Sequence, residues 1–112
     1  MAERLSKLSP DDLAVSAISA AELYHGVARS NRGDSELGRV RSLLDILRVL
    51  DFGTNAAISY GLVRGVLERS GQLIGQVDIL IAGHALSLGA TLVTHNTREF
   101  RRVPGLLVED WG

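Results

Sequence analysis

The stretch QVDILIAGHALSLGATLVT, from Gln76 to Thr94, decides the fold class. Its first part is apolar on nearly every side, and it ends at Gly89, a residue type that commonly closes helices by adopting a left-handed backbone. The part that follows, 90–94, is a continuous apolar run, as expected for a strand in a sheet that is covered on both faces. We therefore predict an α/β domain in which this helix is deeply buried.

The remaining segments alternate strands and helices in the same way. Strands are predicted at 13–19, 48–52, 90–94 and 105–111, and helices at 20–31, within 36–50, from about 54 to 70, and at 76–89. This alternation predicts a parallel sheet with helices on both faces. Residues 1–12 are polar and are predicted to form a helix end or a loop. Because 112 residues is the size of one small domain, a single domain over 1–112 is expected.

Local signals predict where helices begin and which face each one buries. Ser19 has Glu22 three residues further on, the spacing of a capping box, and is predicted to start the first helix. Thr54 or Asn55 is predicted to cap the third helix. The buried stripe of that helix is predicted to consist of Ile58, Leu62, Val66 and Leu67.

Composition excludes several classes of function. The chain has no cysteine, which excludes disulfides and thiolate metal sites. A net charge of −1 is not that of a polybasic protein, so contact with nucleic acid would depend on local arginines. No apolar run approaches the roughly 20 residues of a membrane span, which predicts a cytoplasmic protein without a membrane partner. The arginines cluster at Arg98, Arg101 and Arg102, and at Arg29, Arg32, Arg39 and Arg41.

Polar residues gather where predicted strands give way to helices. Glu22 follows the first strand, Asp78 opens the buried helix, and Thr94, Asn96 and Glu99 follow the next strand. In open α/β sheets, sites form at the carboxyl ends of the strands, so these side chains are expected to meet. Carboxylates and a carboxamide suit a hard cation such as Mg²⁺ or Mn²⁺. Such a cation can polarise a phosphoryl oxygen and supply hydroxide for phosphodiester hydrolysis.

Each of these residues also has a simpler structural explanation. Glu22 is equally well explained as the acidic partner of Ser19, and Asn96 alone is better explained as a helix cap or turn residue. Asp78 would complement a helix dipole, although a carboxylate in so apolar a helix slightly favours a function. His84 has no second histidine at ligand spacing, which favours a hydrogen-bonded, partly buried histidine over a metal ligand.

Two blocks of sequence and the strand between them resemble the PIN-domain ribonucleases, and more closely the VapC toxins of bacterial toxin–antitoxin pairs. The blocks are VSAISAAELYHGVARS and GQLIGQVDILIAGHALSLGATLVTHNTREFRRVPGLLVEDW, and the strand between them is RVLDF. The resemblance covers about residues 13–111. It is most specific from Ile74 to Trp111, where both order and spacing match. It implies a metal-dependent endoribonuclease with a three-layer α/β/α fold.

The resemblance also implies roles for individual residues and partners. Glu22 matches the acid of the family's first helix, and Asp78 matches the acid that opens the D-x-L-I-A helix and is usually a direct metal ligand. Asn96 stands where the family has Asp or Asn, and Thr94 matches a small hydroxyl residue that often lines the pocket. The implied cofactor is Mg²⁺ or Mn²⁺, and the implied substrate is RNA, such as a tRNA or rRNA. The implied partners are a VapB-like antitoxin and a second copy in a homodimer.

One departure from the family is large. The family begins with a central strand that ends in a metal-binding aspartate, and no such strand precedes Leu13. The segment VLDFGTN matches another family strand, so the role is not transferred to Asp51. We therefore expect an N-terminally truncated PIN domain whose sheet is completed by another chain, by an exchanged element or by a separate fragment. The alternative function is a catalytically impaired remnant that acts only by binding an antitoxin or itself.

Overall fold

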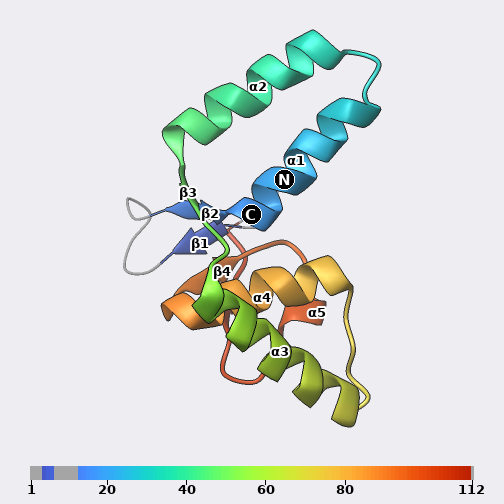
Figure 1. The fold of residues 1–112 in the computed structure, drawn as a ribbon, viewed down its shortest axis with the longest axis vertical. Helices are drawn as coiled ribbons and strands as arrows, with labels where there is room; N and C mark the ends of the chain where they lie inside the picture. The colour runs from blue at the N-terminus through green and yellow to red at the C-terminus, as the bar shows by residue number, and fades with distance from the viewer. Residues whose placement is uncertain (1–3, 7–12, 112) are drawn as a thin grey trace.

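Strands and helices alternate along most of the chain in the computed structural model, which describes residues 4–6 and 13–111 (Figure 1). The strands are β1 (Arg4–Ser6), β2 (Ala14–Ser16), β3 (Arg48–Leu50), β4 (Thr91–Val93) and β5 (Leu107–Glu109). The helices are α1 (Ala17–Arg29), α2 (Gly33–Ile46), α3 (Thr54–Arg69), α4 (Gln76–Leu88) and α5 (Thr97–Phe100). The predicted α/β class is confirmed, although the strands are shorter than predicted.

The strands form one sheet in the order β3-β2-β1-β4-β5. β2 pairs with β3 and β4 pairs with β5 in parallel, as predicted. β1 is antiparallel to both of its neighbours, β2 and β4. Because β1 is antiparallel to both β2 and β4, those two strands run in the same direction, and the carboxyl ends of the four other strands lie along one edge of the sheet.

The filling of the central position corrects two predictions from the sequence. We predicted that residues 1–12 would form a loop or helix end, whereas residues 4–6 form β1; residues 1–3 and 7–12 lie outside the described part of the chain. We also expected another chain or fragment to complete the sheet, whereas the chain's own backbone supplies the pairing. Arg4 pairs with Val93, so the first residue of β1 lies at the edge where β4 ends.

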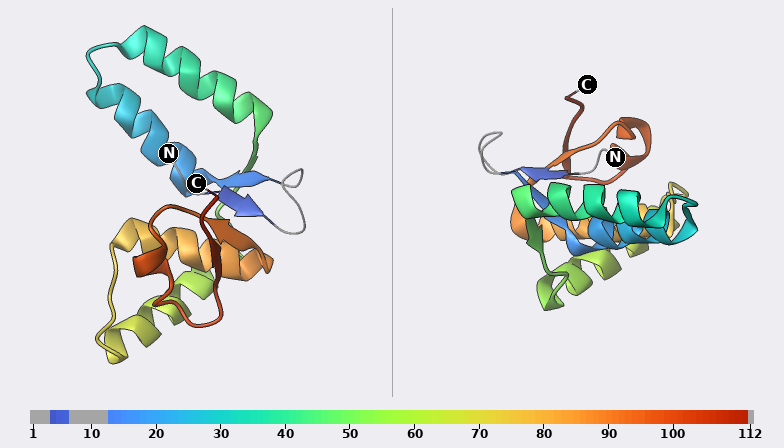
Figure 2. Two further views of the ribbon diagram at one scale, coloured as in Figure 1. Left: turned by 180° about the vertical axis from the view of Figure 1, so that it is seen from behind. Right: turned by 90° about the horizontal axis from the view of Figure 1, so that it is seen from above.

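Four of the helices form two pairs. α3 and α4 pack side by side, while α1 and α2 form a hairpin that projects beyond the sheet (Figures 1 and 2). The close approach of α3 and α4 depends on Gly83, because a Cβ there would lie 2.8 Å from both Cα and N of Tyr60. As predicted, α4 is the most buried helix and ends at Gly89 with φ of 62°. The core around it contains Leu67, Ile79, Ile81, Leu92 and Phe100.

The predicted helix caps are wrong at two places. α1 begins one turn earlier than predicted, with Ser16 as its N-cap; Ser16 Oγ accepts a hydrogen bond from the N–H of Ile18 at 3.1 Å. Ser19 is instead buried inside the helix, so the capping box with Glu22 does not form. At α3, the N-cap is Gly53 and not Thr54 or Asn55. In both cases a neighbouring residue already has the extended backbone that an N-cap requires.

The predicted buried stripe of α3 is largely wrong as well. Leu67 is buried, but Ile58 is 58% exposed and Leu62 is 68% exposed. The helix turns another face toward α4, because the backbone contact between Tyr60 and Gly83 fixes its rotation. The buried side chains of α3 are Ala56, Val63 and Leu67. An apolar strip of Ile58, Leu62 and Val66 therefore remains on the surface of α3.

Candidate active site

Two of the predicted site residues are in direct contact. Asp78 lies in the first turn of α4, and Asn96 lies in the connection between β4 and α5. Asn96 Nδ2 donates a hydrogen bond to Asp78 Oδ2 at 3.3 Å. The prediction that Asp78 and Asn96 lie close together is therefore confirmed.

The turn after β4 holds Asn96 in place through Thr94. The Thr94 side chain is buried, and its Oγ1 accepts a hydrogen bond from the N–H of Asn96 at 3.0 Å. The Thr94 N–H in turn donates to the carbonyl of Glu109 at 2.9 Å, which extends the pairing of β4 with β5. Asn96 occupies the N-cap position of α5, but its side chain makes no cap hydrogen bond. The amide is thus directed to Asp78 and is not used to start the helix.

Asp78 lies in a field of negative charge. Partial burial raises the pKa of its carboxyl above the ordinary value of 3.8, and the charges of Glu99 and Glu22 raise it further. Within the described residues, no ion pair involves Asp78, so its charge is not offset by a basic partner there. The sequence placed both Glu22 and Glu99 among the polar residues expected to meet at the strand ends, but it assigned a metal-binding role to Glu22 alone.

This arrangement fits a metal site that is completed mainly by water. Over residues 4–6 and 13–111, no three acidic, histidine or cysteine side chains lie close enough to hold a metal ion by themselves. Mg²⁺ is nonetheless usually held by one or two carboxylates, with waters and substrate phosphate as the other ligands. The donor set supports the fit, because Asp78 and Asn96 bring a carboxylate and a carboxamide side by side, and the negative charges of Glu99 and Glu22 act at the same place and would attract a cation.

The other candidates lie elsewhere. Asp51 follows β3 and lines a cavity beside His84. His84 is buried and hydrogen-bonded through Nδ1, as predicted for a structural histidine. At the central strand, the residue beside the end of β4 is Arg4 and not a carboxylate. Its Nε is buried without a hydrogen-bond partner among the described residues.

Comparison with known proteins identifies the family. The sequence profile of the PIN domain matches residues 1–106. The chain belongs to the PIN-domain family.

Within this family the chain is similar to VapC proteins. It is 40% identical to ribonuclease VapC2 of Rickettsia felis over 99 residues, and these residues make up 88% of this chain and 74% of that protein. It is 41% identical to the tRNA(fMet)-specific endonuclease VapC of Salmonella typhimurium over 104 residues, and these residues make up 93% of this chain and 79% of that protein. This PIN domain is thus a homologue of the VapC ribonucleases of toxin–antitoxin pairs.

The three-dimensional comparison agrees with the sequence. The crystal structure of DNA-bound VapBC from Salmonella typhimurium superposes on this PIN domain with a TM-score of 0.87 at 42% identity, over 88% of this chain and 75% of that one. The α/β fold predicted for the VapC-like chain is therefore confirmed. No helix in the described part of the chain has the length and apolar character needed to cross a membrane.

Proposed function

We propose that this protein is a metal-dependent endoribonuclease that hydrolyses phosphodiester bonds in RNA and is neutralised by a cognate antitoxin. The observation that carries the proposal is the contact of Asn96 with Asp78, whose pKa is raised by burial and by the charges of Glu99 and Glu22. VapC relatives at about this level of identity bear the name ribonuclease. A carboxylate with no basic partner among the described residues, in such a family, is best explained as part of a site for a divalent cation.

Each residue has a distinct role in this proposal. Asp78 would hold Mg²⁺ or Mn²⁺ directly, and Glu22 would hold it through water or directly. Asn96 orients a water molecule or a ligand, and Thr94 keeps Asn96 in position. Glu99 adds negative charge to the site. When bound, the cation would supply a polarised phosphoryl oxygen and a water molecule of lowered pKa.

Exposed arginines next to the site favour a nucleic-acid substrate. Arg98 and Arg101 are exposed on and just after α5, the helix that Asn96 begins. Arg102 is also exposed, although its guanidinium donates to the carbonyl of Leu73 at 3.0 Å. Guanidinium groups bind phosphate oxygens in a planar, two-pronged geometry. We propose tRNA as the first substrate to test, because the Salmonella relative is named a tRNA(fMet)-specific endonuclease.

The proposed partners are a VapB-like antitoxin and a second copy of the chain. Relatives from Rickettsia and Salmonella were crystallised as VapBC complexes, which supports the antitoxin. The exposed apolar strip of Ile58, Leu62 and Val66 supports self-association, since such surfaces gain free energy when they are covered. Both associations would take place in the cytoplasm, the compartment that the sequence predicts.

The second candidate is a catalytically impaired PIN domain that acts only by binding its antitoxin or itself. One observation favours it: the central strand brings Arg4 to the edge of the sheet where the family resemblance implies a metal-binding aspartate. A site with one carboxylate fewer would bind a cation more weakly.

One experiment separates the two candidates. Purified protein is incubated with a tRNA pool in Mg²⁺, in Mn²⁺ and in excess chelator, and Mn²⁺ binding is measured by calorimetric titration. Discrete cleavage only in the presence of metal, together with binding at one site, is expected for the ribonuclease. Intact tRNA and no metal binding would support the impaired domain.

A further inference from the structure

A buried hydrogen bond joins the start of α1 to the middle of α4. His84 Nδ1 lies 2.7 Å from Ser16 Oγ, and the two side chains are 2% and 1% exposed. Within the described part of the chain, no other side-chain hydrogen bond links β2 or α1 to α4. α1 and α4 have few other contacts with each other, so this hydrogen bond is well placed to fix their relative position.

The hydroxyl of Ser16 takes part in two contacts. Its Oγ accepts a hydrogen bond from the N–H of Ile18 at 3.1 Å, and the same oxygen lies 2.7 Å from Nδ1 of His84. Burial lowers the pKa of the imidazole, which favours the neutral ring. In the tautomer that leaves Nδ1 unprotonated, this nitrogen accepts the hydroxyl hydrogen of Ser16.

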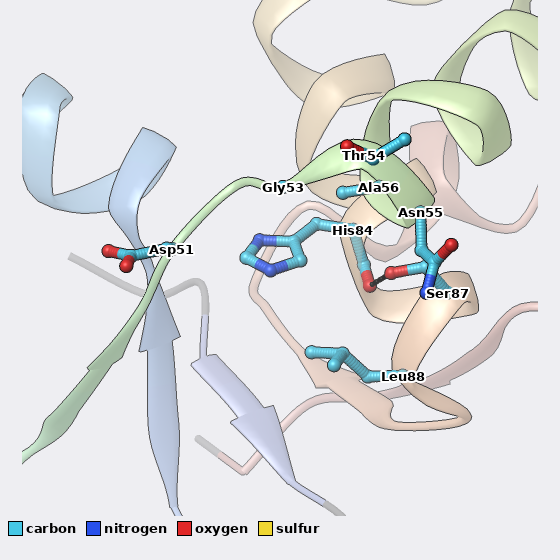
Figure 3. Close-up of a pocket in the computed structure, with 8 residues that line it drawn as sticks. All are labelled: Asp51, Gly53, Thr54, Asn55, Ala56, His84, Ser87 and Leu88. Atoms are coloured by element: carbon cyan, nitrogen blue, oxygen red, sulfur yellow. Dashed lines mark hydrogen bonds between the residues drawn. The ribbon is translucent and has the colours of Figure 1, made fainter.

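Packing alone does not hold the ring. A cavity of about 260 Å³ lies beside it, bordered by Asp51, Asn55 and Ser87 among others (Figure 3). On another side the ring of Phe52 contacts the imidazole edge-on, with centroids 5.4 Å apart. Because a cavity borders one side of the buried ring, its position depends on the hydrogen bond to Ser16 more than that of a side chain packed on every side would.

The two ends of this contact belong to the elements that carry the site. Ser16 is the N-cap of α1, the helix of Glu22, and His84 lies on α4, the helix of Asp78. The charge of Glu22 already acts on Asp78, since it raises the pKa of that carboxyl. Movement of the start of α1 relative to α4 would therefore change the separation of the two carboxylates.

We infer that His84 is a positioning residue which, through Ser16, sets the distance between Glu22 and Asp78 in the cation site. The inference rests on the proposed function and deepens it, because it names a buried residue outside the site that tunes its affinity for the cation. Groups that orient metal ligands from behind typically contribute 10–100-fold to metal affinity or activity.

The test compares variants that differ in one hydrogen bond. His84→Leu removes the acceptor, whereas His84→Asn restores an acceptor oxygen near the position of Nδ1. Ser16→Gly removes the donor from the other side, and glycine is tolerated at N-caps with little loss of helix stability. Ser87→Ala is the matched control, because Ser87 borders the same cavity but its hydroxyl bonds within α4, to the carbonyl of His84.

Mn²⁺ affinity by calorimetry is the first readout, and kcat and KM for RNA cleavage are the second. His84→Leu and Ser16→Gly should each weaken Mn²⁺ binding about tenfold and lower kcat with little change in KM. His84→Asn should recover most of the loss, and Ser87→Ala should match the wild type. The double variant of Ser16→Gly and His84→Leu should be no weaker than either single variant, because both remove the same interaction.

Thermal melting establishes that each variant is folded. If His84→Leu does not fold, Ser16→Gly and His84→Asn decide the question. Folded Ser16→Gly with wild-type Mn²⁺ affinity and kcat would overturn the inference while leaving the proposed function intact. A wild-type protein that neither binds Mn²⁺ nor cleaves RNA would overturn both.

Discussion

Asn96 Nδ2 lies 3.3 Å from Asp78 Oδ2, and this contact joins the turn after β4 to the first turn of α4. The amide hydrogen partly compensates a carboxylate that burial and two neighbouring acids disfavour. Since the amide nitrogen faces Asp78, the amide oxygen of Asn96 is the atom that could orient water or contact a cation. The same contact explains why the two residues should act as a unit.

Cation binding should depend on pH through Asp78. The raised pKa means that the folded protein holds this proton more tightly than the unfolded chain does. The stabilisation that the Asp78 carboxyl gives the metal-free protein is therefore fully present at low pH. It is lost as the pH rises above about 3.8 and through the raised pKa. A cation competes with the same proton, so Mn²⁺ affinity should increase with pH across that window.

Calorimetry in buffers of different ionisation enthalpy measures this coupling. Proton release should accompany Mn²⁺ binding at the acidic end of the range and disappear at higher pH. Asp45→Asn, on exposed α2, serves as the control and should retain the release. Binding without any proton release at the acidic end would contradict the role given to Asp78.

Acid should destabilise the fold through His84. Burial lowers the pKa of this imidazole below its ordinary value of 6.5. Below about pH 6.5 the unfolded chain binds a proton that the folded protein does not, so stability should fall as pH falls toward the lowered pKa, by at most about 1.4 kcal/mol per pH unit. Asp51 borders the same cavity, so its charge is the one to consider beside the ring.

Melting temperatures from about pH 7.5 to about pH 5.5 test the effect of His84. The wild type should lose more stability over this range than His84→Asn, whose side chain does not titrate. Equal slopes for the two proteins would show that His84 is not the group responsible.

Replacing Gly83 should destabilise the contact between α3 and α4. The added Cβ of Gly83→Ala would lie 2.8 Å from backbone atoms of Tyr60, so the helices must move apart. Overpacking of this kind typically costs about 1–3 kcal/mol. Gly61→Ala is the control, because a Cβ there meets nothing within 4 Å and should stabilise α3 by about 0.5–1 kcal/mol. Urea unfolding of both variants measures the difference, and equal shifts would contradict the close helix contact.

The strip of Ile58, Leu62 and Val66 should mediate self-association. Leu62→Glu would place a charge in the middle of that strip and should shift the protein to the monomer in sedimentation velocity. Ile46→Glu is a control on α2 for the general effect of a surface charge, since Ile46 is 82% exposed. A wild-type monomer, or a dimer that persists in Leu62→Glu, would rule out this surface as the interface.

Periodicity was informative for α4 and much less so for α3. The run from Gln76 to Gly89 is apolar all round, so its burial does not depend on how the helix is rotated. α3 has two apolar faces, and the sequence pattern could not distinguish them. The rotation depends on where the backbone of Tyr60 meets Gly83, a contact between distant segments that no local pattern contains.

The candidate site likewise has a part that the sequence pattern indicates and a part that depends on contacts between distant segments. The proximity of Asp78, Asn96 and Thr94 could be predicted because each stands at a strand end or helix start, where α/β sheets place their polar groups. Glu99 was expected near these residues but was given no role of its own, and the contact between His84 and Ser16 was not predicted because it depends on tertiary packing. The antiparallel β1 was missed because three residues are too few to show an alternating pattern.

Asp78→Asn gives the most direct test of the account. Cleavage of a tRNA pool by the wild type and by Asp78→Asn is measured in Mn²⁺, with Asp45→Asn as control and melting curves to establish folding. The account predicts at least about a 100-fold loss of cleavage and no Mn²⁺ binding in Asp78→Asn, with a melting temperature equal to or above that of the wild type because a repelled buried charge is removed. Cleavage by folded Asp78→Asn at the wild-type rate would contradict it.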